Sequence, residues 1–364
     1  MAKTEQCLFE SQIEYQRTSD PLHQLRRYSL LGKSELLRQQ MLEDQFVLDK
    51  IAILGQWTTL FGGPNTGKTL LVLWMLKEKL ASGDLDGNQV FYVNADDNFR
   101  GIVEKTRLAE ECGFHMLAPN LEGFKTTEVL HLLEEFADQQ KAPGVVIILD
   151  TLKKFTDMMN KTEASNFGSI AREFIAAGGT LIALAHVNKN KSADGKSVHS
   201  GTSDIPDDSD CVYILDKVLG SQSDSTTGVE LINTKSRGDV ADKLAFRYER
   251  QIGQTYEDLL ASVRRIEDVE MELMKEHKQL QQTLENNSEL IREISQQIRL
   301  GVTEKTKLVN AVNHSSGFPH NKIRVALSKH EGGIYSLGHR WKVTIGDKNK
   351  HLYELVTERV APVE

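Results

Sequence analysis

An α/β fold with a mostly parallel sheet is predicted for residues 51–253 by two observations. Short apolar runs alternate with helical stretches, which is the pattern of βα units. A glycine-rich motif also stands between one apolar run and the helix that follows it. The predicted strands are Trp57–Phe61, Gln89–Asn94, Gly144–Leu149, Thr180–Ala185, Asp210–Leu215 and Val229–Thr234. The predicted helices are Thr69–Leu80, Asn98–Cys112, Thr127–Gln139 and Phe167–Ala177.

The glycine-rich motif has the spacing Gly, four residues, then Gly-Lys-Thr. Glycines let successive backbone N–H groups converge on phosphate oxygens at a helix N-terminus, where the helix dipole favours anions. The Lys68 ammonium would reach the β- and γ-phosphates, and the Thr69 hydroxyl would hold Mg²⁺. A chance glycine-rich turn is the alternative, and the flanking strand and helix argue against it. The predicted nucleotide-binding residues are Gly62, Pro64, Asn65, Thr66, Gly67, Lys68 and Thr69.

Two acidic positions follow the ends of predicted strands, where ligands sit in sheets of this kind. Asp150 ends an apolar run, and its carboxylate would hold Mg²⁺ through water together with Thr69. Asp96, after the second strand, would orient or deprotonate the water that attacks the γ-phosphate. The alternative for this second position is a helix cap supplied by Asp97 or Asn98. We therefore predict a metal site at Asp150 and a catalytic carboxylate at Asp96.

A histidine and two lysine-bearing loops follow other strand ends. His186 would sense the γ-phosphate from the tip of the fourth strand, although a lone histidine is more often structural. The polar loop 188–208 is long, and such loops are usually functional or disordered. With the shorter loop after Asp150 it could line a channel for a nucleic-acid backbone, and a solvated surface is the alternative. The predicted DNA contacts in these loops are Lys153, Lys154 and Lys189.

A pair of cations, Lys235 and Arg237, follows the last predicted strand. Two such residues at a strand end could be aimed at phosphate bound by the next subunit. An arginine supplied in trans stabilises transition-state charge and is worth roughly 10³ to 10⁵ in rate. An ordinary solvated turn is the alternative, and the spacing alone does not choose between them.

Composition narrows the class of protein. The formal net charge of -8 gives no global sign of nucleic-acid binding, so any basic surface must be local. Three scattered cysteines are too few for a disulfide framework or a zinc site, which fits a reducing cytosol. The N-terminal residues lack the apolar core of a signal peptide, and no run is long enough to span a membrane. These features predict a cytoplasmic protein.

Residues 1–50 are polar with scattered apolar side chains and are predicted to form an N-terminal arm. Ser34 precedes a stretch that has the pattern of a capped amphipathic helix. One interpretation is an arm that packs on the core of its own chain. The other is a segment that docks on a neighbouring subunit.

Residues 254–299 are predicted to form a coiled coil or one long helix. From Leu259 onward, apolar residues recur at steps of four and three over more than four heptads. At 1.5 Å per residue such a helix would extend roughly 60 Å. A helix folded back on its own ATPase domain is the alternative. The apolar seam positions are Val263, Ile266, Leu273, Leu280, Leu284, Ile291, Ile294 and Ile298.

Residues 300–364 have the spacing of a winged helix-turn-helix domain, with helices over Thr303–Asn313 and Pro319–His330 and a strand pair beyond them. Basic residues outnumber acidic ones here, a local asymmetry expected of a DNA-facing module. Winged helices also serve as protein-binding modules. The predicted DNA contacts are His320, Asn321, Lys322 and Arg324 on the recognition helix, and Lys348 and Lys350 on the wing.

The order of these motifs over 51–250 resembles that of RecA-like hexameric P-loop ATPases of the replicative-helicase type. The resemblance rests on a set of motifs in this order: the phosphate loop, Asp96 with Asp97, Asp150, the strip from His186 to Lys189, the Ser200–Ser203 segment ahead of Asp210, and the Lys235–Gly238 segment. It implies a hexameric ring with a nucleic-acid-driven ATPase and a finger residue, Arg237, that acts across the subunit interface. This chain departs from the family at Asp96, where the family commonly has Glu.

Two functions therefore stand as hypotheses. The first is an ATP- and Mg²⁺-dependent helicase or translocase that acts on DNA in replication or recombination of a bacterium or mobile element. Its DNA would be single-stranded in the ring channel and duplex at the winged helix. The second is a DNA-bound ATPase switch, a regulator or loader, that controls assembly without unwinding. The short carboxylate at Asp96 and the tethered winged helix keep this second hypothesis open.

Overall fold

The computed structural model describes residues 21–40, 45–187, 203–218, 225–332 and 338–356. The chain separates into two compact units, Met1–Gln45 and Phe46–Glu364. The described part of the first unit holds two short helices, α2 (Pro21–Arg27) and α3 (Ser34–Gln40). Its exposed large apolar side chains are Leu22, Leu25, Tyr28, Leu30, Leu31 and Leu36. Helices of this length are marginal in water unless an apolar face is packed.

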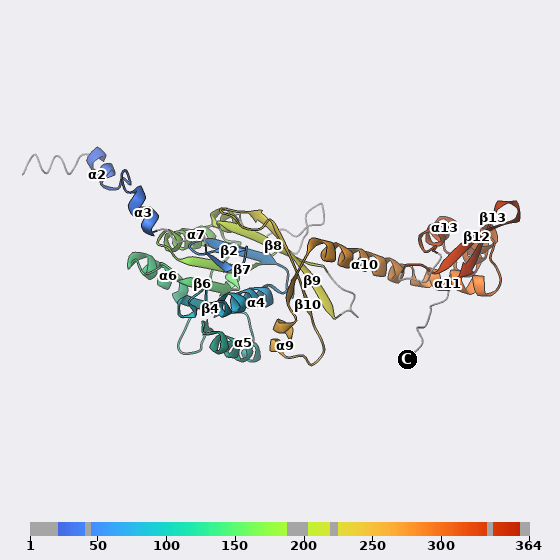
Figure 1. The fold of residues 1–364 in the computed structure, drawn as a ribbon, viewed down its shortest axis with the longest axis horizontal. Coiled ribbons are helices and arrows are strands. Elements are labelled where there is room, and N and C mark those ends of the chain that lie inside the picture. The colour runs from blue at the N-terminus through green and yellow to red at the C-terminus, as the bar shows by residue number, and fades with distance from the viewer. Residues whose placement is uncertain (1–20, 41–44, 188–202, 219–224, 333–337, 357–364) are drawn as a thin grey trace, which may run out of the picture. The chain divides into compact units, whose positions relative to one another are not determined.

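In the described part of the second unit, nine strands form one sheet in the order β11-β10-β9-β8-β3-β7-β6-β4-β5 (Figure 1). The strands from β8 to β5 run parallel, and β9, β10 and β11 add antiparallel pairs at one edge. This confirms the predicted α/β fold with a mostly parallel sheet. The strands are β3 (Trp57–Gly62), β4 (Val90–Asn94), β5 (His115–Leu117), β6 (Val146–Asp150), β7 (Thr180–His186), β8 (Cys211–Val218), β9 (Thr226–Lys235), β10 (Lys243–Glu249) and β11 (Arg264–Ile266).

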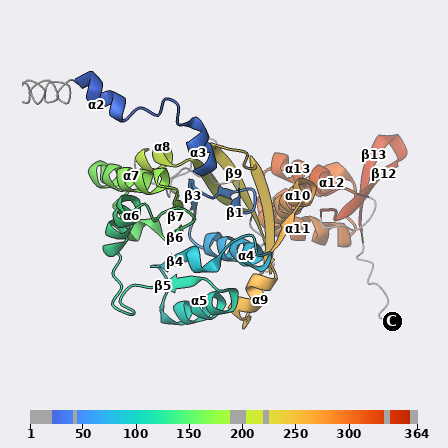
Figure 2. The ribbon, with the colours of Figure 1, turned by 60° about the vertical axis from the view of Figure 1, so that its left-hand side comes forward.

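Helices cover both faces of this sheet (Figure 2). Along β6, Val146 and Ile148 are buried in one apolar cluster while Ile147 and Leu149 are buried in another. Parallel strands covered on both faces have near-continuous apolar sequences, which explains the run that ends in Asp150. The first cluster includes side chains of α4 (Lys68–Ala81), α5 (Phe99–Cys112) and α9 (Tyr256–Ala261). The second includes side chains of α6 (Glu128–Asp138) and α7 (Lys161–Ala176).

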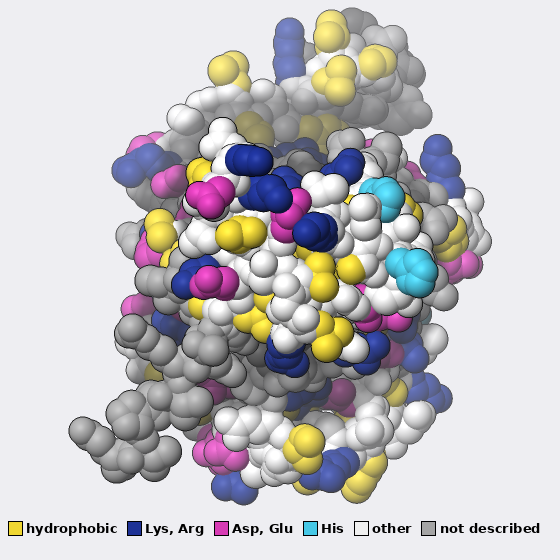
Figure 3. Space-filling model, turned by 90° about the vertical axis from the view of Figure 1, so that its right-hand side faces the viewer, with side chains coloured by type: hydrophobic (Ala, Val, Ile, Leu, Met, Phe, Trp, Pro, Cys, Tyr) yellow, Lys and Arg dark blue, Asp and Glu magenta, His cyan; other side chains and the backbone are white. Residues whose placement is uncertain are grey.

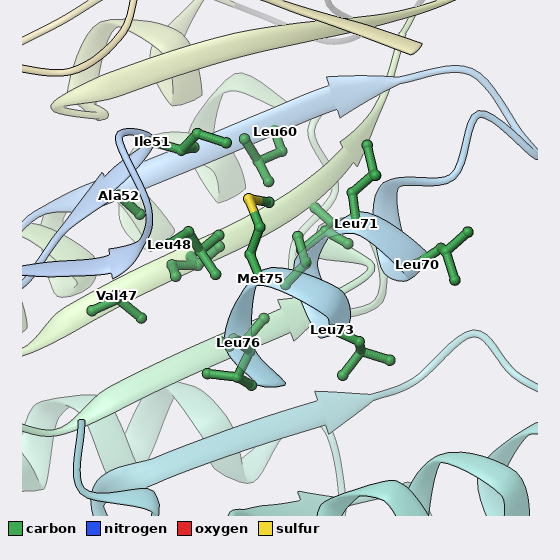
Figure 4. Close-up of a cluster of buried hydrophobic side chains, with 14 of the residues drawn as sticks. Val47, Leu48, Ile51, Ala52, Leu60, Leu70, Leu71, Leu73, Met75 and Leu76 are labelled. Atoms are coloured by element: carbon green, nitrogen blue, oxygen red, sulfur yellow. The ribbon is translucent and has the colours of Figure 1, made fainter. Parts of the chain in front are cut away.

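The helix after the glycine-rich loop is anchored by a small hairpin, β1 (Phe46–Leu48) and β2 (Ala52–Ile53). Figure 4 shows Met75 of α4 between Leu48 of the hairpin and Leu60 of β3. The unit boundary therefore lies between Gln45 and Phe46, slightly before the residue 51 at which the core was expected to begin. This packing fixes the N-terminal end of α4 relative to β3.

Helix α7 begins at Lys161, earlier than the predicted Phe167. The reason is a cap, because the Asn160 side chain accepts hydrogen bonds from the backbone N–H groups of Thr162 and Glu163. The remaining short elements are η1 (Gly87–Gln89), η2 (Leu152–Lys154) and α8 (Asp204–Asp208). Helix α8 occupies the end of the segment 188–208 that was predicted to be a loop, and the part of that segment from 188 to 202 lies outside the described residues.

The expected continuous helix from Leu259 is wrong in its first part. Val263 and Ile266 are buried in separate clusters before any long helix begins, and Ile266 pairs with Ala245 as part of β11. Helix α10 (Asp268–Asn286) starts beyond them, and α11 (Ser288–Arg299) is a separate element. Leu273 and Leu280 are 60% and 42% exposed. A spacing of three and four arises from consecutive short elements that each pack on their own neighbours, so the period alone did not identify one helix.

The C-terminal elements have an apolar cluster of their own, which includes Ile291, Ile294 and Ile298 of α11. Trp341 is fully buried in this cluster, and its Nε1 donates a hydrogen bond to the Leu327 carbonyl at 2.7 Å. The elements are α12 (Lys305–Ser316), α13 (His320–Lys329), β12 (Trp341–Gly346), η3 (Asp347–Asn349) and β13 (Lys350–Leu355). Within the described ranges, none of the helices has both the length and the apolar character needed to cross a membrane.

Candidate active site

The glycine-rich loop joins the C-terminal end of β3 to the N-terminus of α4. Two of its residues have left-handed backbone conformations, Asn65 with φ 57° and Gly67 with φ 91°. This backbone angle favours glycine at position 67, and a Cβ atom there would crowd the Tyr248 ring at 3.1 Å. Residues 64–67 of the loop and the first residues of α4 line one cavity, where backbone N–H groups at a helix N-terminus can bind an anion.

Lys68 is buried, and its Nζ donates hydrogen bonds to the carbonyls of Gly62 and Gly63 at 2.7 and 2.9 Å. Burial lowers the pKa of Lys68 to about 8, and the negative charges of Asp150 and Asp96 oppose this shift. The ammonium is therefore short of anionic partners within the chain. A phosphate group held by the loop would supply the missing negative charge.

Asp150 ends β6, in register with Asn94 of β4 and Leu184 of β7. Its Oδ2 accepts hydrogen bonds from the Thr69 hydroxyl at 2.6 Å and from the Tyr92 hydroxyl at 2.7 Å. Burial raises the pKa of Asp150, and the hydrogen bonds from Thr69 and Tyr92 oppose the rise. A hydroxyl and a carboxylate oxygen in contact at the rim of the loop fit Mg²⁺, which takes oxygen ligands and keeps several waters.

The three adjacent residues in the turn after β4, Asp96, Asp97 and Asn98, make different contacts. Asn98 is the N-cap of α5, since its side chain accepts a hydrogen bond from the Gly101 N–H at 3.0 Å. Asp97 forms an ion pair with Lys105 and accepts a hydrogen bond from Asn94 at 2.8 Å. Asp96 and Asp97 both line the cavity, and the Asp96 carboxylate lies 3.5 and 3.8 Å from the Lys153 and Lys154 ammonium groups.

His186 ends β7 beside Gly62 of β3, so its ring lies against the glycine-rich loop. Burial lowers the pKa of His186, the charge of Lys68 lowers it further, and a hydrogen bond with the Gly62 backbone opposes the shift. The imidazole is therefore neutral at pH 7. One parallel strand, β7, separates the phosphate-loop strand from the strand that ends in Asp150, which places His186 between the two.

These groups surround one cavity of about 310 Å³. The lining residues missing from the prediction include Lys105 on α5, Arg250 directly after β10 and Tyr256 at the start of α9. Neither β10 nor α9 was recognised in the sequence, so Arg250 and Tyr256 had no assigned position. Lys105 did carry a signal, because it lies four residues before Ala109 on the buried face of an amphipathic helix.

The predicted finger residues do not reach this cavity in their own chain. Lys235 ends β9 opposite Val212, near the N-terminal end of β3, whereas the glycine-rich loop follows the C-terminal end. The Lys235 Nζ donates to the backbone carbonyls of Pro206 and Asp207. Arg237 pairs with Asp210 at 3.0 Å, and its side chain is 56% exposed.

The predicted DNA contacts fall in two places. Lys153 and Lys154 are in η2 directly after the Asp150 strand, and Lys189 lies outside the described residues. In the C-terminal elements the predicted residues are exposed, and Lys and Arg side chains lie among acidic and apolar ones on the face shown in Figure 3. Lys350 is paired with Glu304 at 3.1 Å. The exposed residues of α13 in this set are His320, Asn321, Lys322 and Arg324, and those of η3 and β13 are Lys348 and Lys350.

No known protein-family model matches this sequence, and no curated protein matches it. Among solved structures, the chain is similar to the RadB recombinase, with a TM-score of 0.40 and 16% sequence identity. The match covers 62% of this chain and 100% of the RadB chain. A similarity this distant assigns no role to any residue.

Proposed function

We propose that this chain is an ATP- and Mg²⁺-dependent hydrolase of the RecA-like, ring-forming type that acts on DNA. The observation that carries the proposal is the 2.6 Å hydrogen bond between Thr69 and Asp150, which joins the glycine-rich loop to the end of β6. The buried Lys68 and the Asp96 carboxylate line the same cavity as Thr69 and Asp150. Phosphoryl transfer needs this combination of phosphate binding, metal binding and water positioning.

Each residue would then have a distinct part in hydrolysis. The loop amides and Lys68 would hold the β- and γ-phosphates, and Thr69 with Asp150 would hold Mg²⁺, which neutralises phosphate charge when bound. Asp96 would orient the attacking water and accept its proton. His186, neutral and in contact with the loop, would respond to the γ-phosphate.

Coupling to DNA is supported by the surroundings of Asp96. Its Oδ1 lies 3.5 Å from the Lys153 Nζ and 3.8 Å from the Lys154 Nζ. These two lysines are the predicted contacts for a DNA backbone. A phosphate of DNA at η2 would compete with Asp96 for both lysines, so that DNA binding and water activation involve the same charges.

A shared site between subunits is supported by the position of Arg237. In its own chain this residue lies at the edge of the sheet opposite to the glycine-rich loop, with more than half of its side chain exposed. A guanidinium so placed could complete the phosphate site of a neighbouring copy, as an arginine finger does. The proposed assembly is a hexameric ring.

The C-terminal elements support a DNA-binding role for a winged helix-turn-helix module. Helix α13 follows α12 after the short turn Gly317–Pro319 and presents Lys322 and Arg324 at its exposed face. The hairpin β12–β13 carries Lys348 and Lys350 at its turn, in the position of a wing. Such a module would select a DNA site by its recognition helix and hold the backbone with the wing.

A second function, a DNA-bound ATPase switch that does not unwind DNA, is favoured by one observation. Asp96 is a short carboxylate held close to two lysines, an arrangement that suits slow, regulated hydrolysis. ATPase activity with and without single-stranded DNA, measured beside strand displacement, separates the two functions. Stimulation with unwinding supports the motor, and weak hydrolysis without unwinding supports the switch. The mass of the assembly with ATP and Mg²⁺ tests the ring, and loss of nucleotide hydrolysis in Lys68→Ala tests the site itself.

A further inference from the structure

One cation of the cavity wall has no part in the mechanism described above. The side chain of Lys105 is 7% exposed, and its ammonium lies over the Tyr256 ring, 5.2 Å from the ring centroid. An ammonium taken out of water is costly unless a carboxylate compensates for its lost hydration. The position of this lysine on the buried face of α5 therefore requires an explanation.

The compensating carboxylate is Asp97, which forms an ion pair with Lys105. The same oxygen of Asp97 accepts a hydrogen bond from Asn94 at 2.8 Å, and Asn94 is a buried residue at the end of β4. The next residue, Ala95, donates its backbone N–H to the Asp150 carbonyl at 2.6 Å. Asp97 is thus held by the strand on one side and by α5 on the other.

Asp96, in contrast, is weakly held by its own contacts. Its partners Lys153 and Lys154 are half-exposed and lie at 3.5 and 3.8 Å, and exposed pairs of this kind contribute little to a fixed geometry. The direction in which its side chain enters the cavity must therefore come from the backbone of the turn. That backbone is fixed one residue later, by the ion pair of Asp97.

We propose that Lys105 is a positioning residue for Asp96: its ion pair with Asp97 fixes the turn that directs the Asp96 carboxylate at the attacking water. This role rests on the proposed hydrolysis of ATP. It differs from a direct phosphate contact, in which Lys105 would contribute to nucleotide affinity. The two roles separate in kinetics, because loss of positioning lowers kcat while loss of a ground-state phosphate contact raises KM.

The test is steady-state ATP hydrolysis by the full chain carrying Lys105→Met, with binding of a fluorescent ATP analogue measured in parallel. We expect kcat to fall about 10- to 100-fold, the range for a displacement near 1 Å at a reacting centre, while KM and analogue affinity stay within about twofold. Lys105→Arg keeps the charge and should restore part of kcat. Arg107→Met is the matched control on the same helix, since Arg107 pairs with Glu111 at an exposed site and does not line the cavity.

Asp97→Asn tests the same pair from its other end and serves if Lys105→Met does not fold. It should lower kcat like Lys105→Met, and the double variant should be no slower than either single variant. If the losses of kcat in the two single variants multiply in the double variant, or if KM rises while kcat stays intact, the positioning role is overturned. If the wild type hydrolyses ATP and Lys105→Met hydrolyses it equally fast, this role is also overturned, and the proposed function stands. A wild type that binds the analogue without hydrolysing ATP overturns the proposed function and this role together.

Discussion

Arg237 does not line the nucleotide cavity of its own chain, and this position gives a specific prediction. Asp210 is buried and accepts hydrogen bonds from the Trp57 N–H at 2.9 Å, from Arg172 at 2.8 Å and from Arg237 at 3.0 Å. Replacing Arg237 by Ala leaves Asp210 with Arg172 and the amide. Since the Arg237 side chain is more than half exposed, we expect a loss of about 1 kcal/mol in the free energy of unfolding. In the assembled protein we expect ATP hydrolysis to fall roughly 10³- to 10⁵-fold.

Arg172→Ala is the matched control, because Arg172 binds the same carboxylate from α7 and has a side chain that is 37% exposed. It should lose a similar amount of stability, about 1 kcal/mol, and keep its ATPase activity. The double variant leaves a buried charge with one amide, which should cost about 3 to 5 kcal/mol, more than the sum of the single losses. Urea unfolding of the three variants measures these differences.

An experiment that mixes two inactive variants decides whether Arg237 acts in trans. Arg237→Ala and Lys68→Ala should each be inactive alone. When they are combined with ATP and Mg²⁺, some interfaces pair an intact phosphate loop with an intact Arg237, so activity should reappear. Hydrolysis by assembled Arg237→Ala at the wild-type rate would refute the finger role and leave this arginine as part of the Asp210 ion-pair cluster alone.

Three further outcomes follow from other contacts. Replacing both Lys153 and Lys154 by Gln removes the ion pairs of Asp96, so ATPase activity without DNA should rise about two- to fivefold. Stimulation by single-stranded DNA should disappear. Unchanged stimulation would contradict the proposal that DNA and Asp96 compete for these two lysines. Burial lowers the pKa of His330, whose Nδ1 donates to the Gly338 carbonyl at 2.9 Å, so the unfolded state binds the proton more readily and stability should fall as the pH drops below about 6.5. His330→Gln should flatten that slope in urea unfolding measured between pH 7.5 and 5. Arg324→Ala should weaken specific duplex binding about 5- to 150-fold, which corresponds to roughly 1 to 3 kcal/mol for a base contact. Lys348→Gln should weaken binding to all sequences alike and reduce the salt dependence of binding. Equal effects of both variants on sequence preference would argue against a recognition helix.

The phosphate loop and Asp150 could be placed from sequence because their chemistry is local. Glycine spacing, the flanking strand and helix, and an apolar run that ends in Asp each report on one element and its terminus. The separation of Asn98 as a cap from Asp96 and Asp97 needed the structure, since all three residues satisfy the composition of a helix N-terminus.

What could not be placed depends on contacts between distant elements. Lys105 contacts Tyr256 because α5 and α9 both border the cavity, and sequence spacing contains no information about that neighbourhood. The prediction of one continuous helix from Leu259 was wrong for a related reason. Val263, Ile266 and Ile294 have helical spacing, yet each is buried in a different apolar cluster.

The antiparallel hairpin β9–β10 runs between the two ends of the parallel strands, from the N-terminal end of β3 to the glycine-rich loop at its C-terminal end. Strand β9 runs from Thr226 to Lys235, and β10 returns from Lys243 to Glu249, one residue before Arg250 of the cavity. Seven residues of β10 span roughly 24 Å. Because Tyr248 packs against Gly67 near one end and Arg237 follows the other, a shift of the hairpin along its length would change the phosphate loop and the Arg237 edge together. The hairpin therefore links the phosphate loop to the segment that carries Arg237, and its length sets the distance between these two sites.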